Sequence, residues 1–270
     1  MRIASPGHAV FAATMIGVGI LGLMKGDFTA EWQPALKGVP ESQVLAHLCA
    51  FTSLACGVGL LWRRTAAPAA RVLLAYLLLW LLLFRVPGLF HGLTKVDAYW
   101  PLSQTAALLA AAWVLYVWFA DDWDKQRLSS ATSNKGLRIA RALYGAAMIP
   151  FGLAHFQYVE HTASMVPSWL PAHVAWAYFT GAAFIAAGVA VLIGVCARLA
   201  TALSASQMGL FLVLVWVPAA ATRSLNSFQW GEVLSTWVLT TAGWVVTDSY
   251  RGIPWLAMDR PLALTLRQTR

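Results

Sequence analysis

Long apolar segments recur through this chain at a length that matches the thickness of a lipid bilayer. Apolar windows of 17 to 22 residues follow one another between residues 8 and 249, and about 20 residues are needed to cross a hydrocarbon core of about 30 Å. Because that core holds no water, spanning segments must be helices or a closed barrel. Continuous runs such as "RVLLAYLLLWLLLF" lack the alternation of a barrel strand. The sequence therefore predicts an all-α integral membrane protein.

Composition agrees with this fold class. Hydrophobic residues make up 59% of the chain and charged residues only 11%, which leaves too little polar surface for a soluble domain. The first apolar run follows a single basic residue, Arg2, and has no small-residue cleavage site, so we expect a retained helix. Eight transmembrane helices are expected, at roughly 8–24, 43–62, 70–90, 101–120, 137–157, 172–195, 198–221 and 230–249.

The net charge of +8 follows the predicted topology. With the N-terminus inside, fourteen of the 19 Lys and Arg residues fall on internal segments and five on external ones. This is the positive-inside bias, so the basic balance does not indicate nucleic acid as a partner. We expect a multi-pass protein of a bacterial cytoplasmic (inner) membrane, with both termini cytoplasmic.

The chain contains an internal repeat. "HAVFAATMIGVGI" (8–20) aligns with "RALYGAAMIPFGL" (141–153) at an offset of 133, and from the second span onward the offset is 131, which pairs Val86-Pro87 with Val217-Pro218. Each unit has four spans, so both insert in the same orientation. We expect two pseudo-symmetric four-helix bundles related by an axis along the membrane normal. The predicted parts are a first unit (1–120), a cytoplasmic linker (121–136), a second unit (137–250) and a cytoplasmic interfacial tail (251–270).

Polar residues gather in "GLAHFQYVEHTASMVPSWLP" (152–171), at the outer end of the fifth span. A helix through 152–162 would carry two polar faces: His155, Tyr158 and Thr162 on one, and Gln157, Glu160 and His161 on the other. Pro167 and Pro171 then prevent a regular helix. Irregular backbone at that depth must be covered by protein or face water. The segment predicts a Trp-lined pocket near the external interface, roofed by residues 158–171.

Candidate residues follow from this pocket. Candidates for proton handling are His155, Glu160 and His161; candidates for ligand binding are His155, Gln157, Tyr158, Trp169, His173 and Gln207; structural polar positions are His47, Arg85, Arg223 and Glu232. An ionisable group inside a membrane is a functional candidate by default.

Each candidate also has a structural interpretation. A helical histidine often bonds a neighbouring carbonyl, Trp169 would anchor a helix end, and Glu160 and His161 would be wet loop residues. Gln207 would bond across a helix interface, and Arg85 would snorkel or pair with Asp97 or Glu232.

The repeat favours the second unit as the site. The first unit carries Gly22, Met24 and Phe28 where the second has His155, Gln157 and His161, and keeps only the acid, Asp27 for Glu160. Histidine spacing suits no metal, and haem, P-loop and dinucleotide motifs are absent from the sequence. We therefore expect no metal and no intrinsic cofactor.

The second unit resembles the DoxX family of small four-helix membrane proteins. The resemblance rests on "RIARALYGAAMIPFGLAHF", "MVPSWLP" and "WAYFTGAAFIAAGVAVLIGVCARLAT", and covers about residues 137–221. It implies a subunit of a membrane redox system, with residues 152–171 contributing to a site for a quinone or another lipophilic molecule.

Three functions remain open from the sequence. The first is an auxiliary DoxX-like subunit that binds a quinone beside a redox partner protein. The second is a lipid-acting acid–base enzyme, isomerase-like, using His155 and Glu160. The third is a small-molecule transporter or scaffold. Matched helix breaks at Pro87 and Pro218 would support a transporter. The ligand, the partner and the oligomeric state are left open.

Overall fold

The computed structural model describes residues 3–28, 42–90, 92, 96–222 and 225–258, and these are helical apart from turns and one isolated bridge. The elements are α1 (Pro6–Lys25), α2 (Ser42–Leu61), α3 (Ala66–Trp80), η1 (Leu81–Arg85), α4 (Val86–Leu89), α5 (Val96–Phe119), α6 (Asp122–Arg127), α7 (Ser129–Thr132), α8 (Asn134–Gln157), α9 (Val159–Met165), α10 (His173–Ile193), α11 (Ala197–Phe211), η2 (Leu212–Trp216), α12 (Val217–Thr222) and α13 (Ser227–Asp248). The chain is an α-helical membrane protein, as the sequence predicts.

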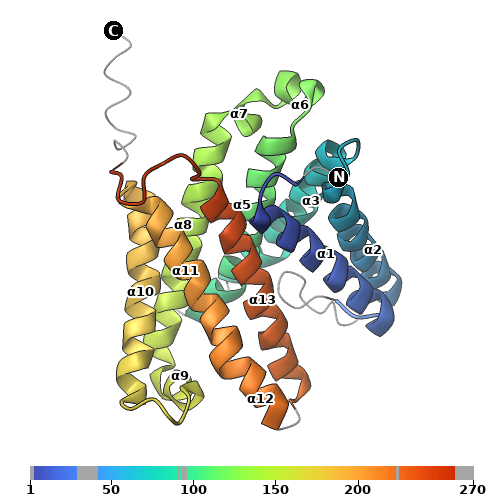
Figure 1. Ribbon diagram of the computed structural model, residues 1–270. Coiled ribbons are helices and arrows are strands. Elements are labelled where there is room, and N and C mark those ends of the chain that lie inside the picture. The colour runs from blue at the N-terminus through green and yellow to red at the C-terminus, as the bar shows by residue number, and fades with distance from the viewer. Residues whose placement is uncertain (1–2, 29–41, 91, 93–95, 223–224, 259–270) are drawn as a thin grey trace.

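Seven helical segments among the described residues are long and apolar enough to cross a membrane. They are α1, α2, the continuous α3–η1–α4, α5, α8, α10 and the continuous α11–η2–α12. The predicted eighth span, 230–249, coincides with α13, which has 22 residues. Helix α13 is less apolar because it carries Glu232 and the polar run of threonines at 236, 240 and 241. It nonetheless packs against α1, α5 and α11 and runs alongside α11 (Figure 1).

Glycines bring the first two helices of each repeat unit into close contact. A Cβ atom added at Gly19 of α1 would lie 2.5 Å from the backbone of Leu54 on α2, and one added at Gly57 of α2 would lie 2.8 Å from the carbonyl of Ala12 on α1. Such small residues allow two membrane helices to approach backbone to backbone. This interface therefore depends on residues with no side chain.

Helices α8 and α10 meet in the same way. A Cβ added at Gly152 would lie 2.4 Å from the carbonyl of Gly181, and one at Gly188 would lie 2.6 Å from the carbonyl of Gly145. Gly152 and Gly188 are the repeat equivalents of Gly19 and Gly57 at offsets of 133 and 131. The same pair of positions thus forms the close contact in both units.

Among the described residues, a π-helical segment occurs at the equivalent position of each sequence repeat. Val86 donates its N–H to the carbonyl of Leu81, five residues back, and Val217 does the same to Leu212, at the offset of 131. A proline follows each valine. Because proline has no N–H and its ring clashes with the carbonyl four residues earlier, a wider turn just before it relieves both problems.

The predicted linker is folded. Residues 121–136 hold α6, α7 and the start of α8, which begins at Asn134 and so three residues before the expected 137. Helices α6 and α7 lie at one end of the molecule, and α9 and α12 lie at the other (Figure 1). An Asp-x-x-Asp capping box, in which Asp121 and Asp124 each accept the other's N–H, starts α6.

The described part of the tail docks onto the α10–α11 turn. Cys196 donates its N–H to the carbonyl of Ala257 at 2.8 Å, and Arg198 donates to the carbonyl of Ile253 at 2.8 Å. The Arg198 guanidinium also lies 4.1 Å above the Trp255 ring. Residues 251–258 are therefore held at the same end of the molecule as α6 and α7 (Figure 1), while the remainder of the predicted tail lies outside the described residues.

Candidate functional site

His155 lies on α8 inside a group of aromatic rings. Its ring centroid is 5.5 Å from that of Phe184 on α10 and 5.9 Å from that of Phe211 on α11, stacked on the latter. The side chain is half-buried. His155, Phe184 and Phe211, which we call the His155 cage, bring together three helices of the second unit.

The hydrogen bond of His155 decides what its ring can offer. Nδ1 lies 2.8 Å from the carbonyl oxygen of Phe151, one turn earlier. A carbonyl only accepts, so Nδ1 carries the proton, and in the neutral ring Nε2 is left with a lone pair. Neutral His155 is thus a hydrogen-bond acceptor. Donation from His155 to the carbonyl of a ligand would require the charged form.

The opposing helix leaves room for His155 only because of a glycine. A Cβ added at Gly181 of α10 would lie 2.8 Å from the His155 Cβ and 2.8 Å from the Phe156 ring. In the first unit the equivalent pair is Gly22 and Ala50, with the glycine on the other helix. The second unit therefore places a side chain where the first has none.

The expected single helix through 152–162 is wrong. Helix α8 ends at Gln157, Tyr158 adopts φ −110° and ψ 42°, and α9 starts at Val159. The two polar faces inferred for that helix are absent, since Glu160 lies on a different helix from His155. Residues 159–165 are helical, so the irregular stretch is confined to about 166–172.

Tyr158 at the break connects the end of α8 to α5. Its hydroxyl donates to a carboxylate oxygen of Asp97, at the start of α5, and accepts from the Gln157 side chain at 3.1 Å. The bond to Asp97 raises the pKa of the Tyr158 hydroxyl, because ionisation would place two negative charges together. Asp97, one of the partners suggested for Arg85, is thus engaged by Tyr158.

The other residues of the predicted pocket point outward. Glu160 and His161 are exposed, and Trp169 is 68% exposed. The hollow at this end of α10 is open and shallow, about 680 Å³, and His173 and Tyr178 are among its lining residues. It is not the Trp-roofed pocket that the sequence suggested, because the ring of Trp169 lies outside it.

Of the remaining candidates, two form hydrogen bonds to backbone carbonyls, two are half-buried, and one lies outside the described residues. Gln207 donates to the carbonyl of Thr180 at 3.0 Å, which joins α11 to α10. His47 bonds the carbonyl of Gln43 through Nδ1 at 2.7 Å. Glu232 and Arg85 are half-buried on α13 and η1. Arg223 lies outside the described residues.

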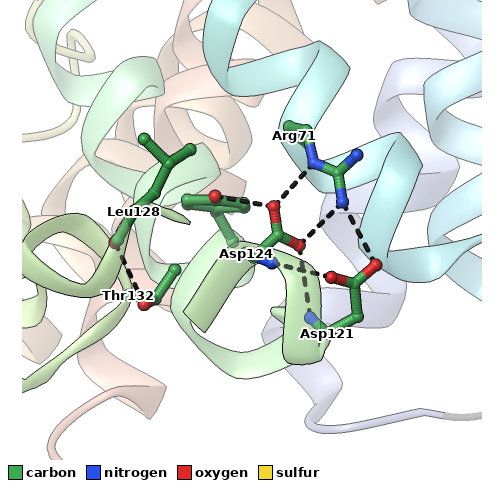
Figure 2. A network of polar contacts seen from close by, with 6 residues as sticks. Arg71, Asp121, Asp124, Leu128 and Thr132 are labelled. Atoms are coloured by element: carbon green, nitrogen blue, oxygen red, sulfur yellow. Dashed lines mark hydrogen bonds and ion pairs between the residues drawn. The ribbon is translucent and has the colours of Figure 1, made fainter. Parts of the chain in front are cut away.

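Sequence reasoning missed the polar cluster at the opposite end of the molecule (Figure 2). Arg71 of α3 donates to both carboxylate oxygens of Asp124, at 2.6 and 2.9 Å, and to Asp121 at 3.1 Å. Tyr116 of α5 donates to Asp124 at 2.8 Å, and the guanidinium of Arg71 lies 4.6 Å above the Trp123 ring. The cluster ties the linker helix α6 to α3 and α5. Its only sequence signal is the Asp-x-x-Asp spacing of the capping box.

Asp124 is ionised in this cluster despite being fully buried. Burial alone would raise its pKa, but the hydrogen bonds from Arg71 and Tyr116 and the attraction of the guanidinium outweigh it, so the pKa of Asp124 lies below its ordinary value. The carboxylate is saturated by protein donors. We interpret the cluster as a structural clamp, which leaves the His155 cage as the candidate functional site.

Within the described residues, no group of three or more His, Cys, Asp or Glu side chains is placed to hold a metal ion. A family model described as a domain of unknown function (DUF8561) matches residues 144–238. The match runs from α8 into α13 and so contains the whole His155 cage. No curated protein and no solved structure matches the chain.

Proposed function

We propose that eight helices span the membrane as two four-helix units related by a pseudo-twofold axis. Equivalent helices support this arrangement: α1 packs on α2 as α8 packs on α10, and α5 packs on α8 as α13 packs on α1. The amide of Gln104 on α5 donates to the hydroxyl of Ser235 on α13 at 2.8 Å, and these residues are 131 apart. A residue that bonds its own repeat equivalent lies at such an axis.

Helix α13 is the eighth span of this arrangement. Its polar threonines bond carbonyls of their own helix: the hydroxyl of Thr236 reaches Glu232 at 2.7 Å, and that of Thr240 reaches Thr236 at 2.7 Å. These bonds lower the cost of placing hydroxyls in a membrane. The fourteen-to-five distribution of basic residues supports an orientation with the α6–α7 end and both termini in the cytoplasm.

The proposed activity is binding of a lipid-soluble molecule with a hydroxylated ring, such as a quinol, at the His155 cage. The observation that carries it is the bond from Nδ1 to Phe151, which leaves Nε2 as an acceptor on a ring whose centroid lies 5.5 and 5.9 Å from those of two phenylalanines. A quinol hydroxyl donates to such an acceptor, and its flat ring stacks on aromatic walls. A quinone offers only acceptors and would need the charged imidazole.

The proposal keeps the sequence expectation of an auxiliary subunit that binds a lipophilic molecule, but replaces the quinone by its reduced form. The resemblance to the DoxX family supports placing the chain beside a redox partner protein that exchanges electrons with the bound molecule. The lipid isomerase is the weaker alternative: His155 faces Phe184 and Phe211, Glu160 is exposed on α9, and no hydrogen bond joins the two.

Direct binding to the full chain in detergent tests the proposal. We expect a short-chain quinol to bind more tightly than its quinone at neutral pH. His155→Phe keeps the ring but removes the acceptor, and loss of one hydrogen bond of about 0.5–1.5 kcal/mol lowers affinity roughly two- to tenfold. Glu160→Gln is the matched control and is expected to bind as the wild type does. Unchanged quinol binding by His155→Phe would disprove the role of the cage.

A transporter is the second candidate, because the two π segments lie at the same place in both units. Transporter sites form where helices of both repeats are interrupted, and π segments gather at functional sites. Uptake of a labelled small molecule into vesicles, lost when Pro87→Ala and Pro218→Ala replace the two prolines that follow the π segments, would favour it. Binding of a quinol without uptake would favour the first candidate.

A further inference from the structure

A shallow apolar groove lies between α2 and α3, near the turn that joins them. Its volume is about 800 Å³ and it is open to the surroundings. Small and apolar groups line it, among them Ala55, Val58, Gly59, Pro68, Val72 and the ring of Trp62. Ala55, Val58 and Pro68 are exposed. In a membrane, an open groove of this kind faces acyl chains.

Two cations stand beside the groove. Arg63 and Arg64 occupy the turn directly after Trp62, both are exposed, and neither forms an ion pair with any residue that the structure describes. Trp62 is 60% exposed, as expected for an indole at the level of lipid headgroups. The apolar groove thus lies beside two arginines that form no ion pair with the described residues.

The second unit treats the equivalent place differently. At an offset of 131 the turn becomes 193–196, without arginines, and Leu199 and Leu203 replace Pro68 and Val72. The chain covers this turn with its own tail through the bond from Cys196 to Ala257. The guanidinium of the nearby Arg198 donates to a backbone carbonyl and lies above an indole ring. The chain fills and covers this place in one unit and leaves it open in the other.

We propose that the α2–α3 groove binds an anionic phospholipid, with an acyl chain along Ala55 and Pro68 and the phosphate between Arg63 and Arg64. Guanidinium groups bind phosphate oxygens through paired N–H donors, and basic sites between membrane helices bind anionic headgroups. A second copy of the chain packed symmetrically on this face would bring unpaired arginines together, which charge repulsion opposes.

Native mass spectrometry of the full chain, released from detergent with defined lipids, tests this proposal. Wild type is expected to retain phosphatidylglycerol in preference to phosphatidylcholine. The double variant Arg63→Gln/Arg64→Gln should bind phosphatidylglycerol about 25-fold more weakly at low salt, from the usual contribution of a basic residue near an anionic surface. The control Lys135→Gln/Arg138→Gln removes two exposed charges from the same end of the molecule, away from the groove, and should keep the preference.

A groove-filling variant tests the binding of the acyl chain separately from the binding of the headgroup. Ala55→Leu adds bulk at an exposed lining position and should weaken both lipids by a similar factor. Equal retention of the two lipids by wild type would overturn the proposal, as would equal losses in the two charge variants. A dimer that Ala55→Leu converts to monomer with lipid binding unchanged would assign the groove to a second copy. Thermal unfolding of each variant verifies that it is folded.

Discussion

The clamp around Asp124 gives the sharpest quantitative test of the structure. Asp124 is 0% exposed and accepts hydrogen bonds from both Arg71 and Tyr116. Asp121 binds the same arginine, but its side chain is 45% exposed. Replacing each acid by asparagine keeps its shape and removes its charge. The two variants therefore compare a buried carboxylate with an exposed one on a single guanidinium.

The expected magnitudes differ. Removing one partner of a buried ion pair costs about 3–5 kcal/mol, but the Arg71 side chain is 34% exposed, and water compensates part of its charge. We therefore expect about 2–3 kcal/mol for Asp124→Asn. For Asp121→Asn the ordinary value of an exposed pair applies, less than about 1 kcal/mol.

Tryptic cleavage of the linker measures this difference. Lys125 and Arg127 are exposed on α6, and cleavage there requires the helix to open. When opening is faster than cleavage, the rate follows the population of the open form. Asp124→Asn should then be cut about 30- to 150-fold faster than wild type, and Asp121→Asn less than about fivefold faster. Equal rates for the two variants would refute the assignment of Asp124 as the buried partner.

The clamp also has a defined pH dependence. Because the pKa of Asp124 is lowered in the folded protein, the clamp is fully effective above the unfolded value of about 4 and weakens as the pH falls through the lower folded value. Protection of the linker should be constant between neutral pH and about pH 5 and should decrease only in stronger acid.

Three further predictions concern the helix interfaces. Gly181→Ala places a methyl group 2.8 Å from side chains of α8 and should lower the unfolding free energy by about 1–3 kcal/mol, whereas Gly231→Ala, which meets nothing within 4 Å, should leave the thermal midpoint in detergent unchanged or raised. A double-mutant cycle of Gln104→Leu and Ser235→Ala should give a coupling of about 0.6–1.7 kcal/mol, and strict additivity would exclude their hydrogen bond. Tyr158→Phe breaks the bond to the α5 carboxylate, and the component it removes from a spectroscopic alkaline titration should have a pKa above that of an ordinary tyrosine; loss of a component with the ordinary pKa would contradict the contact.

Much of the architecture follows from sequence patterns that are local. A run of about 20 apolar residues has few alternatives to a membrane helix, so most of the expected spans reappear within a few residues of their predicted ends. The repeat also carries structural detail: one Val-Pro pair in each unit is preceded by a π turn. This is a local effect, because the proline lacks the N–H that would bond the carbonyl four residues earlier.

The tertiary structure alone decided how the polar groups are used. His155 was expected at the site, but its acceptor state depends on the carbonyl of Phe151 and on rings from α10 and α11. The helix break at Tyr158 accompanies a contact with Asp97, 61 residues away, and the Asp124 clamp joins positions 53 residues apart. Apolar periodicity in the sequence predicts which face of a helix is buried. A buried polar atom is stabilised by whichever donor or acceptor the packing brings within about 3 Å, and only the arrangement of distant helices determines that partner.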